Sequence, residues 1–132
     1  MLAIESSGRL AIIEIKLSNN AESRRAVVAQ VLAYAAFLRG WDTAQLEQQI
    51  LQKHLSQRKY ASLLDAASTD DQEGSLDATV FSGELSEGLA AGAFRLVFVL
   101  DQAPPDLIRL VSYLEAVTDR LVIDLITVSA YR

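Results

Sequence analysis

Apolar residues at the start of the chain follow the pattern of two β-strands. Residues 2–5 and 9–17 are rich in leucine and isoleucine, whereas Ser6, Ser7 and Gly8 between them favour a turn. We therefore expect a β-hairpin over the first 17 residues. Its second strand is apolar on both faces for most of its length, which is typical of a central, buried strand.

The next stretch has the spacing of two helices. Either Asn19 or Asn20 can cap the first helix, which runs to about Arg39 and is ended by Gly40. The second helix begins at Asp42. Its apolar stripe consists of Leu46, Ile50, Leu51 and Leu55.

Residues 68–86 differ in composition from their neighbours. Serine, aspartate, glutamate and glycine dominate there, which predicts a flexible, acidic and exposed loop with a short helix from about Glu84. Beyond this loop we expect a strand at 94–100, a helix at 104–118 and a final strand at 121–131.

The order of these elements predicts one domain over residues 1–132, with an α/β (α+β) fold in which helices flank a mixed sheet. With 132 residues, 51% of them hydrophobic, the chain can bury a substantial core. Its longest apolar stretch, 26–38, is shorter than the roughly 20 residues that cross a bilayer, and its first residues do not resemble a secretory signal. We expect a cytoplasmic protein without a membrane partner.

Charge and cysteine content narrow the possible chemistry. The chain lacks cysteine and has one histidine, so a metal ion would be held mainly by oxygen. The net charge of −5 argues against a nucleic-acid partner, because phosphate binding usually needs a basic surface. However, the first 40 residues contain five bases and three acids, and the other 92 contain seven bases and fourteen acids. If the chain has a site for a polyanion, we expect it in the first third.

Two charged residues lie at the end of the second predicted strand. Side chains alternate along a strand, so Glu14 and Lys16 point to the same face, beside Leu10 and Ile12. Burying a charge costs on the order of several kcal/mol unless the charge is paired or bound to a metal. The two residues either form an ordinary ion pair where the strand reaches solvent, or belong to a functional site.

The following helix also carries polar side chains on an otherwise apolar segment. Gln30 is its most polar residue between positions 26 and 38, and the helical repeat places Ser23, Val27, Gln30 and Tyr34 on one face. Nearby backbone groups could satisfy the hydrogen-bonding groups of Gln30 and Tyr34 without any functional role. Alternatively, this helix packs on the strand so that Gln30 and Tyr34 face Glu14 and Lys16.

The run GRLAIIEIKLSNNAESRRAVVAQVLAYAAFL combines both features and resembles the PD-(D/E)XK nuclease superfamily. In that superfamily, Glu-x-Lys on a hairpin strand is followed by a helix that bears Gln-x-x-x-Tyr. The resemblance covers residues 1–39 closely and residues 93–131 more loosely. It implies a restriction-endonuclease-like fold and hydrolysis of phosphodiester bonds in DNA with Mg²⁺ or Mn²⁺.

The resemblance also implies a role for individual residues. Glu14 would ligate the metal together with the backbone carbonyl of Ile15, and Lys16 would orient the attacking water or stabilise charge at the phosphate. Gln30 and Tyr34 would position the site. The helix N-terminus favours anions, so the neighbouring pair Arg24 and Arg25 either contacts DNA phosphates or is simply solvated.

One residue of the family pattern is missing. The first acid of the superfamily comes from the strand before Glu-x-Lys, where Glu5 is the only acid in this chain. The hairpin places Glu5 opposite Arg9 or Leu10, roughly 15 Å along the sheet from Glu14. Glu5 and Glu14 therefore cannot share an ion, and we expect Glu5 to be solvated at the turn.

The missing acid leaves two interpretations. The chain is either a fragment that lacks the N-terminal part of the core and an Asp before Met1, or a degenerate member that lost the reaction. Both predict weak or absent metal-dependent cleavage. The alternative function is a non-catalytic module that uses the same sheet to bind a protein or a second copy of itself, as a homodimer.

For three other polar residues we expect structural rather than functional roles. His54 is expected on the surface and Asp124 exposed on an edge strand. Asp101, which follows a strand and precedes Pro104, is expected to cap the next helix.

Overall fold

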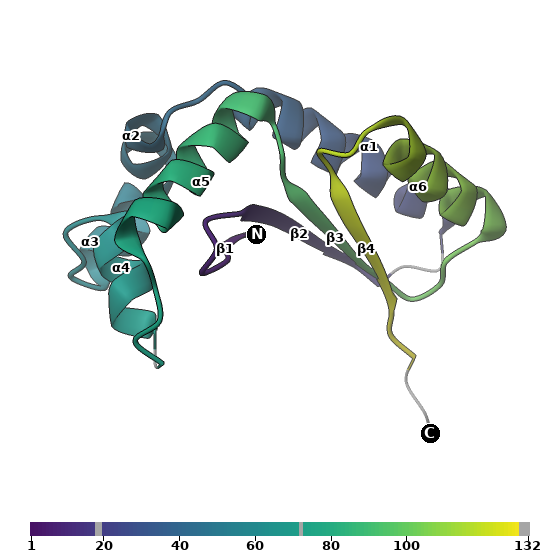
Figure 1. Ribbon diagram of the computed structural model, residues 1–132. Coiled ribbons are helices and arrows are strands. Elements are labelled where there is room, and N and C mark those ends of the chain that lie inside the picture. Colours follow the sequence, from purple (N-terminus) through teal and green to yellow (C-terminus); the bar gives the residue numbers. More distant parts are fainter. Residues whose placement is uncertain (18–19, 72, 130–132) are drawn as a thin grey trace.

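The computed structural model describes residues 1–17, 20–71 and 73–129 (Figure 1). The predicted hairpin is present at its N-terminal end. Strands β1 (Leu2–Ile4) and β2 (Leu10–Lys16) pair antiparallel, with Ala3 opposite Ala11. The register is one of the two that the length of the turn predicts.

Two further strands extend the sheet beyond β2. β3 (Arg95–Leu100) pairs parallel with β2, and β4 (Val122–Thr127) pairs parallel with β3, which gives the order β1-β2-β3-β4. The strand predicted at 94–100 is confirmed. The final strand is shorter than predicted, and residues 130 and 131 of that prediction lie outside the described residues.

The first predicted helix is confirmed as α1 (Ala21–Leu38). Asn20 caps it, because its side chain accepts a hydrogen bond from the backbone N–H of Glu22. Asn19, the other candidate for this cap, lies outside the described residues.

The second predicted helix is also confirmed, although its middle is a π-helical turn. It begins with a capping box between Asp42 and Gln45. Its successive parts are α2 (Thr43–Leu46), η1 (Glu47–Leu51) and α3 (Gln52–Gln57).

The loop predicted over residues 68–86 is wrong for most of its length. The end of α4 (Leu63–Asp70) occupies its beginning, and α5 (Ala78–Ala91) starts well before Glu84. Asp77 caps α5 by accepting hydrogen bonds from two backbone N–H groups of its first turn. The inner face of α5 buries Phe81, Leu85 and Leu89, which recur every four residues. Polar residues on its outer face gave the segment the composition of a loop.

The chain forms a mixed α/β fold with a four-stranded mixed sheet flanked by helices. The last helix, α6 (Pro105–Val117), leads from β3 to β4 and confirms the helix predicted at 104–118. Strand order follows chain order, and connections between parallel strands are right-handed, so both crossovers place their helices on the same face (Figure 1). The sheet contributes to the core on this face through Leu10, Ile12, Leu96, Phe98, Leu100 and Ile123.

The opposite face of the sheet, called the bare face below, is not covered by any helix in the described part of the chain (Figure 1). Alternation along the paired strands places Ala3, Ala11, Ile13, Ile15, Val97, Val99 and Ile126 on it. In β3 the residues of the covered face are buried, whereas Val97 and Val99 are only half-buried. Because parallel sheets are normally covered on both faces, an apolar bare face is unusual.

None of the helices in the described part of the chain has both the length and the apolar character needed to cross a membrane.

Candidate functional site

Glu14 and Lys16 lie at the carboxyl end of β2, on the face that the helices cover. They continue the row of Leu10 and Ile12, which are buried under the helices. Burial decreases along the strand, so that Glu14 is half-buried and Lys16 is exposed. Their placement on one face agrees with the prediction from strand alternation.

The backbone of Ile15 is directed toward the β1 side of β2. Met1 and Ile13 exchange two backbone hydrogen bonds, of 3.1 and 2.8 Å, and therefore form a hydrogen-bonded pair of the antiparallel ladder. Alternation gives Ile15 the same orientation, but β1 reaches only as far as the partner of Ile13. Within the described residues, no strand pairs with Ile15 on that side. Its carbonyl oxygen is thus available next to the Glu14 carboxylate.

Neither charged side chain is engaged by a neighbour. Among the residues that the structure describes, Glu14 and Lys16 form no ion pair, with each other or with another side chain. The ordinary ion pair considered from the sequence is therefore not formed in this part of the chain. A half-buried carboxylate and an exposed ammonium group remain available for ligands.

Gln30 and Tyr34 differ in their surroundings. The side chain of Gln30 is exposed on α1. Tyr34 is partly buried, and this burial raises the pKa of its hydroxyl group. Tyr34 lines a cavity with Met1 and Leu2 that does not reach Glu14. The structure therefore does not bring Tyr34 into one cavity with Glu14. Ser23 was predicted on the same helix face, and its side chain is not among those that the structure describes.

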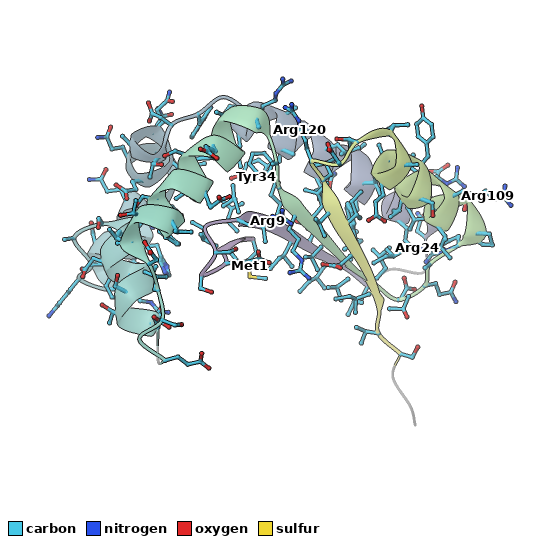
Figure 2. All side chains as sticks on the ribbon, viewed as in Figure 1. Met1, Arg9, Arg24, Tyr34, Arg109 and Arg120 are labelled. Carbon is cyan, nitrogen blue, oxygen red and sulfur yellow. The ribbon has the colours of Figure 1, made fainter. Side chains whose placement is uncertain are left out.

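The two arginines near the start of α1 form ion pairs. Arg24 is only 6% exposed, and one of its terminal nitrogens lies 3.2 Å from a carboxylate oxygen of Asp101. Arg25 pairs with Asp106 at 3.6 Å, and both of these side chains are largely exposed. Figure 2 shows Arg24 at the end of α1 that is distant from Tyr34 and Met1.

The capping role predicted for Asp101 is wrong. α6 begins after Pro104 without a side-chain cap, whereas Asp101 turns toward the buried Arg24 of α1. Asp101 lies three residues before Pro104, which occupies the N-cap position of α6, and its carboxylate forms a charge-assisted hydrogen bond with Arg24.

Sequence reasoning missed a cluster on the bare face. Arg95 of β3 forms ion pairs with Glu5, beside the hairpin turn, and with Asp124 of β4. The hydrogen bonds to Asp124 and then Glu5 raise the pKa of Arg95. The prediction that Glu5 is simply solvated is wrong. Asp124 does lie on an edge strand, as predicted, but it is half-buried in this ion pair rather than exposed.

The oxygen donors near Glu14 fit only a weakly held divalent cation. Mg²⁺ retains several waters and accepts one or two carboxylates, which Glu14 and the Ile15 carbonyl could supply in part. In the described residues, no group of three or more acidic or histidine side chains could hold a metal ion. His54 is exposed on α3, as predicted, and lies outside this region.

Comparisons with protein-family models, with curated proteins and with solved structures find no match to this chain.

Proposed function

We propose that this chain is a nuclease-like domain with a restriction-endonuclease-like sheet. In this proposal Glu14, Ile15 and Lys16 form a weak site for a divalent cation and a DNA phosphate. The observation that supports it is that Glu14, Ile15 and Lys16 lie together at the end of β2, where no strand of the described residues pairs with β2 beyond Ile13 on its β1 side.

Each of these groups has a defined role in phosphodiester chemistry. Glu14 and Ile15 would hold Mg²⁺ or Mn²⁺, which on binding lowers the pKa of water and neutralises phosphate charge. Lys16 projects on the same face as Glu14 and would place a positive charge beside the scissile phosphate. Gln30, exposed on α1, would contact the sugar-phosphate backbone.

The two arginines would differ in their contribution to DNA binding. An exposed ion pair is worth only about 0–1 kcal/mol, so Arg25 can leave Asp106 for a phosphate at little cost. Arg24 is buried with Asp101 and would hold the start of α1 in place instead. Arg25 is therefore the better candidate for a phosphate contact.

Efficient cleavage is not expected from one carboxylate. We expect supercoiled plasmid incubated with Mg²⁺ or Mn²⁺ to be nicked no faster by the wild-type chain than by Glu14→Ala. A site with one acidic side chain binds the cation too weakly to activate water at a useful rate. Gel electrophoresis of the plasmid measures the rate. Rapid nicking that requires both the metal and Glu14 would show that the site is complete.

A second candidate function is self-association through the bare face. Its apolar side chains lie on three adjacent strands. The ion-paired Glu5 and Arg95 lie toward the other end of the sheet, and Asp124 lies beside Val97 on the edge strand β4. An apolar centre with a polar rim is the usual composition of a protein interface. A second copy would cover the face that the helices leave open.

A further inference from the structure

The free edge of β1 presents unpaired backbone groups. Met1, Ala3 and Glu5 are the positions at which β1 exchanges hydrogen bonds with β2. In an antiparallel ladder the intervening residues point their N–H and C=O groups the other way. Leu2 and Ile4 therefore direct two donors and two acceptors outward, and no hydrogen bond to them occurs among the described residues.

A groove runs along this edge. A cavity of about 220 Å³ separates β1 from α3 and α4 and is lined by Leu2, Ile4, Leu55, Leu63 and Phe81, among others. A second cavity, which contains Tyr34 and Met1, shares Leu2, Leu51 and His54 with the first. The two cavities therefore adjoin each other beside β1. An apolar hollow with a few polar groups is the usual form of a ligand site.

One cation at this groove has no acidic partner. Arg58 lines the cavity, is exposed, and forms no ion pair within the described part of the chain. The nearby acid Asp70 already accepts a hydrogen bond from the Tyr60 hydroxyl at 3.3 Å. Lys53 in α3 and Lys59, which follows α3, add positive charge near Arg58 in a region of the chain that is otherwise acidic. The groove thus favours a ligand with a carboxylate.

We propose that this groove binds an extended peptide segment of another protein that contains an acidic residue. The segment adds to the sheet as a strand beside β1 and pairs with the backbone of Leu2 and Ile4. Alternate apolar side chains enter the cavity, and a carboxylate binds Arg58. Strand addition to an exposed edge obtains affinity from backbone hydrogen bonds and specificity from pockets for alternate side chains.

The test uses fluorescein-labelled hexapeptides with amidated C-termini, in which the second, fourth and last side chains share one face of the added strand. Leucine, isoleucine, valine or phenylalanine occupies the second and fourth positions, and glutamate occupies the last. We expect anisotropy titrations to give saturable binding. N-methylation of a peptide amide that faces β1 should weaken the binding by about 10-fold, because that amide can no longer pair with β1.

Substitutions in both partners test the carboxylate contact. Arg58→Gln should weaken binding by about 5-fold or more, and by much less when the peptide carries glutamine in place of glutamate. Arg109→Gln is the matched control, because Arg109 is exposed on α6, away from β1 (Figure 2). The fold of each variant is checked by its thermal transition.

Three results would overturn the proposal. One is that no peptide of the set binds better than its N-methylated form. Another is that Arg58→Gln and Arg109→Gln have the same effect. The third is that the backbone amides of Leu2 and Ile4 become protected from hydrogen exchange as the concentration of the protein alone rises, since a second copy would then occupy the edge.

Discussion

Gly8→Ala is expected to destabilise the domain by about 3 kcal/mol or more. Gly8 has a φ of +94°, which a residue with a side chain rarely adopts. In addition, a Cβ atom at this position would lie 2.6 Å from the carbonyl oxygen of Phe81 and 3.0 Å from Cβ of Glu84, both in α5. The backbone oxygen cannot move without shifting α5 or the hairpin. Urea unfolding followed by the fluorescence of Trp41 measures the change in the free energy of unfolding.

Gly40→Ala is the control for backbone conformation alone. Gly40 has nearly the same φ, +90°, and an added Cβ atom there would meet none of the described atoms within 4 Å. We expect this variant to lose only about 1–2 kcal/mol. The difference between the two variants reports the contact between the hairpin turn and α5. Equal losses would contradict the packing of α5 against the hairpin.

Ile126→Lys is expected to weaken self-association of the chain by about 100-fold, since a charge would then enter the apolar part of the interface. Four strands spaced by about 4.8 Å and about 20 Å long give the bare face an area of roughly 400 Å². Standard interfaces bury about 800 Å² per partner, so the wild-type dimer should be weak. Sedimentation equilibrium over a range of concentrations measures the dissociation constant.

Ile108→Lys is the matched control for this experiment. Ile108 lies on α6 and is 47% exposed, and Ile126 on the bare face is 46% exposed. A lysine at either position can keep its ammonium group in water in the monomer. The control should associate like the wild type. A strictly monomeric wild type, or equal weakening by both substitutions, would exclude the bare face as the interface.

The hairpin, α1 and the helix that begins after Asp42 were predictable because local signals decide them. The short turn at residues 6–8 permits only two registers, and the structure has one of these. The capping box at Asp42 fixes the start of the second helix from residues close in sequence. α5 was missed because its polar outer face outweighs its three buried apolar residues in composition. Only the packing of α5 against the hairpin shows that its apolar face is the buried one.

The candidate site was predictable only in part. Strand alternation is sufficient to place Glu14 and Lys16 on one face. The position of Tyr34 depends on how α1 lies over the sheet, which sequence periodicity does not fix. The ion pairs of Arg95 join β3, β4 and the hairpin turn, whose residues lie as many as 90 positions apart, so no local pattern could reveal them. The pairing of Arg24 with Asp101 is likewise a product of the tertiary fold.

Titration with Mn²⁺, followed by the paramagnetic broadening of backbone amide signals, tests directly whether the Glu14 region is a cation site. We predict saturable broadening centred on residues 14–16 with a dissociation constant on the order of 1 mM, as suits a site with few protein oxygen ligands. Glu14→Gln should abolish it, and Glu22→Gln, which alters an exposed carboxylate in the first turn of α1, should leave it unchanged. Broadening that is absent from residues 14–16, or that is identical in the wild type and Glu14→Gln, would contradict the account.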